Sequence, residues 1–157
     1  MTLFRLLTEG SRVLELAGSP DPKQDAQQLL LAAFHLDMVH FLMNRMTELE
    51  ESSKNQASIR LYQDMIGRRK KRCPLQHILG RQEFMGMEFM VNRHVLIPRQ
   101  DTETLVEKVL EHQEQEKKKG QALLDLCTGS GCIAVSLAAK GGFDRVTGTD
   151  ISEEALK

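Results

Sequence analysis

An acidic, glycine-containing segment, Asp125-Leu126-Cys127-Thr128-Gly129-Ser130-Gly131, directly follows the apolar residues 122–124. Glycine lacks a Cβ atom and adopts positive φ at little cost, so the backbone of such a turn can approach a ligand closely. Residues 133–139 contain no glycine or proline and predict a helix, whose first N–H groups can bind polar ligand atoms. The order predicts a strand, a cradle for a nucleotide cofactor and a helix.

A second acid, Asp150, follows residues 145–149, which predict another short strand. In a βαβ unit, an acid at the end of the second strand is placed to accept hydrogen bonds from ribose hydroxyls. We therefore expect Asp150 to contact the ribose of the cofactor.

Two classes of cofactor fit this pattern. Residues 129–134 read as G-x-G-x-x-A, the dinucleotide fingerprint, and Asp150 lies near its expected distance of about 20 residues. Asp125, however, resembles the acid that opens motif I of class I methyltransferases, which use S-adenosylmethionine (SAM). Cys127 stands where that motif has its first glycine, a departure that is mild at negative φ and costly in the left-handed region. A third interpretation stays open, in which the glycines serve only the packing of a strand, turn and helix.

The residues before this segment are predicted to be helical up to about residue 80. Apolar side chains recur at helical spacing in residues 3–16, and Asp21 and Pro22 are typical of the start of a second helix. Residues 38–49 and 59–72 predict two more helices. We expect the methionines of the third, Met38, Met43 and Met46, to fill the core.

The basic run at residues 68–72 lies at the predicted end of the fourth helix, shortly before Pro74. Cations there complement the helix dipole, which favours a solvated helix end. Docking to an acidic or nucleic-acid-bearing partner is the functional alternative.

Shorter elements are predicted between the bundle and the glycine loop. Residues 83–89 and 95–97 predict two strands of a hairpin that turns around Asn92-Arg93. Asp101 is predicted to cap a helix over residues 102–115.

Composition limits the classes of protein that the chain can represent. It has 157 residues and a formal net charge of −1, which gives no general reason to expect a nucleic acid or a membrane surface as partner. The first ten residues do not resemble a signal peptide, and no apolar run approaches the roughly 18 residues of a membrane span. We expect a cytoplasmic protein with reduced cysteines.

Four motifs occur in order along the chain, and together they resemble the HemK-type (PrmC) protein-(glutamine-N5) methyltransferases. They are Pro74-Leu75-Gln76-His77-Ile78-Leu79-Gly80, Phe84-Met85-Gly86-Met87-Glu88-Phe89, Leu96-Ile97-Pro98-Arg99-Gln100-Asp101-Thr102-Glu103 and Asp125-Leu126-Cys127-Thr128-Gly129-Ser130-Gly131. One departure is Gln100, where the family usually has proline, and its effect is expected on the turn alone.

The resemblance implies an α/β fold with three parts. Residues 1–80 would form an all-helical substrate-binding bundle, residues 81–100 a β-hairpin linker, and residues 101–157 the first part of a class I (Rossmann-like) SAM methyltransferase domain. The family methylates the glutamine side-chain amide in the Gly-Gly-Gln loop of peptide chain release factors. Members use SAM as methyl donor.

The resemblance also assigns the candidate site. We expect SAM to contact the backbone of Cys127, Thr128, Gly129, Ser130 and Gly131 and the carboxylate of Asp150. Asp125 would orient the turn or the cofactor's amino group, and Pro98 and Arg99 would lie at the pocket entrance. No metal site is predicted.

The family's catalytic signature, Asn-Pro-Pro-Tyr, does not occur in the 157 residues. The sequence is therefore expected to be a truncated, amino-terminal half that is inactive alone. Two rival functions stay open: a fragment of a nicotinamide-dependent oxidoreductase, and a non-enzymatic module that docks a release factor.

Overall fold

The computed structural model describes residues 1–116 and 120–157, and these form two compact units, Met1–Leu79 and Gly80–Lys157. Each unit has a hydrophobic core of its own. Within the described residues, no helix combines the length and the apolar character needed to cross a membrane. All three cysteines are free.

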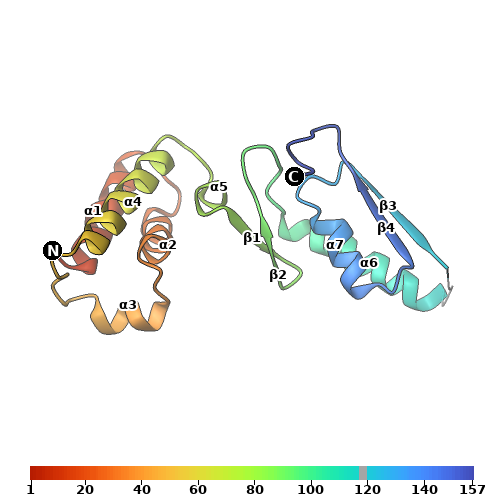
Figure 1. Cartoon of the computed structure of the whole chain (residues 1–157), viewed down its shortest axis with the longest axis horizontal. Helices are drawn as coiled ribbons and strands as arrows, with labels where there is room; N and C mark the ends of the chain where they lie inside the picture. Colours follow the sequence, from red (N-terminus) through yellow and green to blue (C-terminus); the bar gives the residue numbers. More distant parts are fainter. Residues whose placement is uncertain (117–119) are drawn as a thin grey trace. The chain divides into compact units, whose positions relative to one another are not determined.

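The first unit is helical, as the sequence predicts (Figure 1). Its helices are α1 (Leu3–Leu16), α2 (Pro22–Phe34), α3 (Met38–Asn44), α4 (Ser53–Lys70) and α5 (Leu75–Leu79). The side chains of Thr2 and Ser52 cap α1 and α4 by accepting hydrogen bonds from the N–H groups of Arg5 and Asn55. Asp21 precedes α2 as predicted, but its side chain makes no capping hydrogen bond.

The core of this unit lies between α1, α2 and α4. Leu14, Leu29 and Leu30 are fully buried there. Gly10 of α1 lets α4 approach closely, because a Cβ atom at this position would stand 2.0 Å from the hydroxyl oxygen of Tyr62. That hydroxyl donates a hydrogen bond to the carbonyl of Leu6 at 3.2 Å, and burial raises the pKa of Tyr62.

The prediction for the methionine-rich helix is wrong. Helix α3 ends at Asn44 instead of continuing to residue 49, and Met38, Met43 and Met46 are 43%, 77% and 68% exposed. After α3 the chain runs back to the start of α1, where Thr2 and Glu48 form an isolated β-bridge. These three exposed side chains therefore do not fill the core between α1, α2 and α4.

The basic run is also more than a solvated helix end. The side chain of Arg69 donates to Asp25 Oδ2 at 2.8 Å and to the carbonyl of Cys73 at 3.2 Å. Arg72 donates to the carbonyl of Gly18 at 2.9 Å. Asp25 belongs to α2, and Gly18 lies between α1 and α2. The two arginines therefore bind the end of α4 to this region.

In the second unit, the described residues form two pairs of strands and two helices (Figure 1). Its elements are β1 (Arg81–Phe84), β2 (Met87–Met90), α6 (Gln100–Glu116), β3 (Ala122–Leu126), α7 (Cys132–Lys140) and β4 (Arg145–Thr149). Strands β1 and β2 form an antiparallel hairpin, and β3 and β4 pair in parallel with α7 between them in sequence. The observed fold is thus a helical unit followed by a mixed unit with a short parallel sheet.

Two local predictions in this unit are wrong. The hairpin turns at Met85-Gly86, not at Asn92-Arg93, and residues 95–97 form no strand. Asp101 lies inside the first turn of α6, which begins at Gln100, so it is not the capping residue. A Met-Gly turn is a weak sequence signal, because two-residue hairpin loops favour Asn-Gly or Asp-Gly.

Candidate functional site

The loop that joins β3 to α7 lies at the carboxyl ends of the two parallel strands. The register places Asp125 beside Gly148 and Leu126 beside Thr149. Carboxyl ends of parallel strands form the edge at which α/β proteins bind ligands. The predicted cradle therefore lies where the two strands end together.

Asp125 holds this loop in shape. Its Oδ2 atom accepts a hydrogen bond from Thr128 Oγ1 at 2.6 Å and another from the N–H of Ala134 at 3.2 Å. The N–H of Thr128 in turn donates to the carbonyl of Thr149 at 2.8 Å. One carboxylate thus joins the strand, the turn and the first turn of α7.

The turn demands the left-handed conformation at three positions. Cys127, Gly129 and Gly131 have φ values of 62°, 56° and 74°. For a residue with a Cβ atom this conformation costs about 1 kcal/mol or more. Cys127 is exposed. Because it adopts positive φ, the presence of cysteine in place of the motif's first glycine costs conformational free energy.

The carboxylate of Asp150 accepts hydrogen bonds from backbone N–H groups. Its Oδ2 accepts from the N–H of Gly129 and its Oδ1 from the N–H of Ser152, both at 2.9 Å. These hydrogen bonds, that of Ser152 first, lower the pKa of Asp150 below its ordinary value. The carboxylate therefore stays ionised and ties the glycine loop to the end of β4.

Gly148 is a residue of this site that the sequence analysis missed. A Cβ atom at Gly148 would stand 2.9 Å from Thr128 Oγ1 and 3.1 Å from its Cγ2. The strand thus needs glycine here so that Thr128 can reach Asp125. A glycine inside a strand pattern often marks such a close approach, and this was the available signal.

A cleft of about 690 Å³ opens beside the loop, within the second unit. Its walls come from the hairpin and the residues after it, the glycine loop, α7, β4 and the last four residues. The lining residues are Glu88, Phe89, Met90, Asn92, Val95, Thr128, Gly129, Ser130, Gly131, Ala134, Val135, Ala138, Val146, Gly148, Glu154, Ala155, Leu156 and Lys157. The volume is that of a typical small-molecule site, about 300–1,000 Å³.

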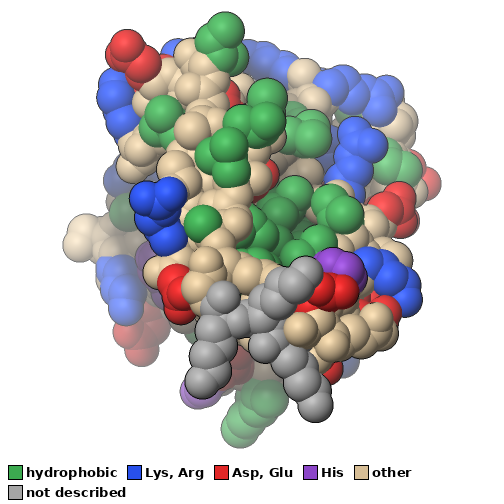
Figure 2. Space-filling model, turned by 90° about the vertical axis from the view of Figure 1, so that its right-hand side faces the viewer, with side chains coloured by type: hydrophobic (Ala, Val, Ile, Leu, Met, Phe, Trp, Pro, Cys, Tyr) green, Lys and Arg blue, Asp and Glu red, His purple; other side chains and the backbone are tan. Residues whose placement is uncertain are grey.

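One face of the strand pair is uncovered. The side chains of Leu124 and Leu126 are 59% and 69% exposed, whereas Leu123 packs against the core that includes α7. Figure 2 shows hydrophobic side chains gathered on the face of the molecule that it presents. Leu124 and Leu126 do not line the cleft.

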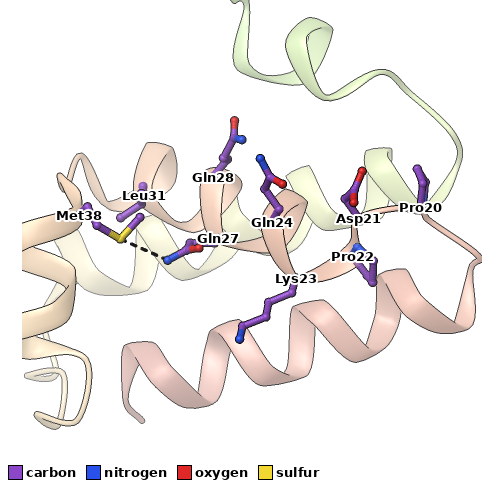
Figure 3. Close-up of a pocket in the computed structure, with 9 residues that line it drawn as sticks. All are labelled: Pro20, Asp21, Pro22, Lys23, Gln24, Gln27, Gln28, Leu31 and Met38. Carbon is purple, nitrogen blue, oxygen red and sulfur yellow. Dashed lines mark hydrogen bonds between the residues drawn. The ribbon is translucent and has the colours of Figure 1, made fainter.

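A second hollow, of about 550 Å³, lies in the helical unit (Figure 3). It is lined by Pro20, Asp21, Pro22, Lys23, Gln24, Gln27, Gln28, Leu31 and Met38. Gln27 Nε2 donates to Met38 Sδ at 3.3 Å, while Gln24 and Gln28 point away from that contact. Its polar lining consists mostly of amides, and it contains none of the predicted site residues.

Known proteins are similar to this chain in both units. Residues 5–80 match the family described as PrmC N-terminal domain. The chain is 42% identical over 134 residues to a release factor glutamine methyltransferase of Clostridium acetobutylicum, covering 85% of this chain and 45% of that protein. Residues 5–80 are thus a PrmC N-terminal domain, and the chain as a whole is similar to release factor glutamine methyltransferases. The similarity to family members continues beyond the helical unit, through the glycine loop.

Two further relatives define how far the match extends. A release factor glutamine methyltransferase of Koribacter versatilis is 40% identical over 157 residues, covering 100% of this chain and 54% of that protein. A bifunctional methyltransferase of Rickettsia bellii is 35% identical over 180 residues, covering 99% of this chain and 32% of that protein. The chain therefore spans about half the length, or less, of these PrmC relatives.

The predicted site residues divide into two groups. Thr128, Gly129, Ser130 and Gly131 line the cleft, while Asp125, Cys127 and Asp150 support the loop or border it without lining the cleft. Pro98 is buried, Arg99 is exposed, and neither lines the cleft. Contacts of any of these residues with SAM stay predictions.

The buried thiol next to the loop is Cys132, the first residue of α7. Burial raises the pKa of the Cys132 thiol, and the nearby Asp125 carboxylate acts in the same direction. Among the described residues, no group of three or more histidine, cysteine, aspartate or glutamate side chains could hold a metal ion. The site thus offers hydrogen-bonding groups from a loop, without an activated thiol at α7.

Proposed function

We propose that this chain supplies the methyl-donor site and the substrate-binding helical unit of a SAM-dependent protein-glutamine methyltransferase. The substrate would be the glutamine side-chain amide in the Gly-Gly-Gln loop of a peptide chain release factor. The observation that carries the proposal is the Asp125–Thr128–Ala134 hydrogen-bond set, which holds a left-handed loop beside a cleft of about 690 Å³. The names of the matched relatives support the substrate class.

The residues of the cleft fit a donor of this kind. A Cβ atom added at Gly129 would meet no other atom within 4 Å, so the loop leaves open space on the ligand side. Bound SAM would supply a methyl group on a sulfonium centre. The loop residues 128–131 would hold the donor through the backbone, and Asp150 would accept a hydrogen bond from its ribose.

Positioning must supply most of the rate gain. An amide nitrogen is a weak nucleophile because its lone pair is delocalised into the carbonyl, so its orientation toward the donor decides the reaction rate. The 157 residues contain the donor loop and not the Asn-Pro-Pro-Tyr sequence that the family resemblance assigns to the acceptor. We therefore expect donor binding by this chain without methyl transfer.

Donor binding is the first test. The 157-residue chain is titrated with SAM, S-adenosylhomocysteine and NAD while its thermal unfolding is recorded. A ligand present at 100 times its dissociation constant stabilises the folded state by about 2.7 kcal/mol. We expect stabilisation by the first two ligands; stabilisation by NAD alone would instead support a nicotinamide-dependent oxidoreductase.

A matched pair of variants links that binding to the loop. Thr128→Val keeps the shape of the side chain but removes the donor to Asp125, and it should weaken donor binding. Thr104→Val makes the same exchange at an exposed position of α6 and should leave binding unchanged. Equal affinities for the two variants would contradict the proposed role of the loop.

Methyl transfer is tested in a chimera. In this chimera, the 157 residues replace the residues of the Koribacter versatilis relative that they match. The match includes 100% of this chain. Purified release factor is then incubated with SAM and its Gly-Gly-Gln peptide is analysed by mass spectrometry. A folded, donor-binding chimera that leaves the glutamine unmethylated would refute the proposed substrate.

Capture of the release factor by the 157-residue chain distinguishes a methyltransferase from a non-enzymatic docking module. A non-enzymatic docking module would hold the release factor without responding to SAM or S-adenosylhomocysteine. Release-factor capture together with failure of every donor titration would therefore favour the docking module over the methyltransferase.

A further inference from the structure

The turn of the β1–β2 hairpin has a strained backbone and is hydrogen-bonded to a side chain of α6. Met85 and Gly86 have φ values of 53° and 74°, as a two-residue type I′ turn requires. Glycine tolerates this conformation, whereas a long side chain such as that of Met85 disfavours it. A contact from outside the hairpin must therefore stabilise the turn at Met85.

Glu103 provides that contact. Its Oε1 atom accepts a hydrogen bond from the N–H of Met85 at 2.6 Å, and the bond is partly buried. Glu103 belongs to the first turn of α6, one turn before the fully buried Val106. A hydrogen bond to an ionised acceptor is short and stronger than a neutral one, so the carboxylate fixes the turn to α6.

The hairpin carries one wall of the cleft. Glu88, Phe89 and Met90 of β2 line it together with residues of the glycine loop. Phe89 is 7% exposed and packs edge-to-face on Phe84, with ring centroids 6.2 Å apart and planes at 75°. Because Phe84 directly precedes the turn, the position of the Phe84–Phe89 pair depends on the conformation of Met85-Gly86.

We propose that Glu103 is a positioning residue for the donor cleft. It lines no part of the cleft itself. Its carboxylate holds the Met85-Gly86 turn on α6, which sets the hairpin wall at the distance from the glycine loop that the donor requires. This inference rests on the proposed function, because it takes the cleft to be the donor site.

The test measures the dissociation constant of S-adenosylhomocysteine for the 157-residue chain by calorimetry, below the unfolding transition of every variant. Glu103→Ala should raise that constant by up to about tenfold, the limit at which ligand binding must supply the whole free energy of the lost hydrogen bond, about 1.4 kcal/mol, to position the turn. Glu103→Gln keeps an acceptor oxygen and should restore most of the affinity. Glu107→Ala removes an exposed carboxylate one turn further along α6 and should change nothing.

A second substitution separates positioning from general stability. Asn-Gly is the preferred sequence of a type I′ turn, so Met85→Asn needs no support from Glu103. In the Glu103→Ala background, Met85→Asn should bring the dissociation constant back toward that of the original chain. A variant that merely lost stability would show a lower melting temperature with unchanged affinity in the folded state.

The outcomes distinguish the two proposals. If the original chain binds S-adenosylhomocysteine and Glu103→Ala binds it equally well, the role of Glu103 is refuted while the donor site stands. An equal loss at Glu107→Ala, or no recovery with Met85→Asn, also overturns the inference. If the original chain does not bind the ligand, the proposed donor site fails, and this role of Glu103 fails with it.

Discussion

The ion pair between Asp25 and Arg69 gives the sharpest prediction for the stability of the helical unit. The side chains are only 7% and 15% exposed, and Arg69 Nε lies 2.8 Å from Asp25 Oδ2. The same oxygen accepts a hydrogen bond from Ser19 Oγ at 2.7 Å. Without Arg69, the buried carboxylate of Asp25 would keep the hydroxyl of Ser19 as a hydrogen-bond partner but would have lost its cation.

The expected cost of Arg69→Met is large. Breaking a buried pair by removing one partner destabilises a protein by about 3–5 kcal/mol, because the remaining charge is uncompensated. For a unit of this size, about 4–8 °C of melting temperature corresponds to each kcal/mol, so a fall of about 12 °C or more is expected. The carbonyl of Cys73 also loses its bond from Arg69, which acts in the same direction.

The assay is thermal and urea unfolding followed by circular dichroism. The variants are Arg69→Met, Asp25→Leu and the double variant, which together give a coupling energy. The double variant should be much less destabilised than either single one, because an apolar pair leaves no buried charge. Arg5→Met is the matched control, since Arg5 pairs with Glu9 on the surface with exposed fractions of 68% and 54%.

An exposed pair of that kind contributes about 0.2–1 kcal/mol. The stabilising role of the buried pair is refuted if Arg69→Met is no more destabilising than Arg5→Met. It is also refuted if the coupling energy between the Asp25 and Arg69 positions is below about 0.5 kcal/mol, the usual limit of additivity for independent sites.

Three further predictions concern single positions. Cys127→Gly should stabilise the second unit by about 1 kcal/mol in urea unfolding, because glycine relieves the left-handed strain; a loss of stability would contradict the strain. Gly10→Ala should lower the melting temperature despite its better helix propensity, because the new Cβ collides with Tyr62 and overpacking costs about 1–3 kcal/mol. Asp150 should titrate below the ordinary carboxyl value in NMR; its hydrogen bond to the N–H of Gly129 is then fully present above that ordinary value and is lost as the pH falls through the lowered pKa. A midpoint at or above the ordinary value would contradict this.

Local patterns in the sequence were sufficient for several elements. The apolar spacing of α1 and α2 and the strand-turn-helix from Ala122 to Lys140 follow from rules that act over a few residues. The parallel pairing of β3 with β4 follows from their connection through a single helix. These predictions depend on backbone periodicity and turn chemistry, which the chain carries locally.

Long-range contacts decided the features that the sequence analysis predicted wrongly or missed. Met38, Met43 and Met46 were expected to share one buried helix, yet α3 ends at Asn44 and all three side chains are exposed. The basic run has the composition of a solvated helix end, yet Arg69 meets Asp25 across 44 residues of sequence. Periodicity shows which residues share a face, but not whether another element covers that face.

The same division applies to the candidate site. The sequence alone determined that a strand, a turn and a helix follow one another around residues 125–131. It also predicts that this turn binds a ligand, because an acid and glycines after a strand are typical of such sites. The tertiary structure decided that Cys127 is held at positive φ, that Gly148 makes room for Thr128, and that Glu103 accepts a hydrogen bond from the hairpin turn. Each of these depends on atoms that come together only when the strands, the hairpin and α6 pack, and a one-dimensional pattern does not contain those distances.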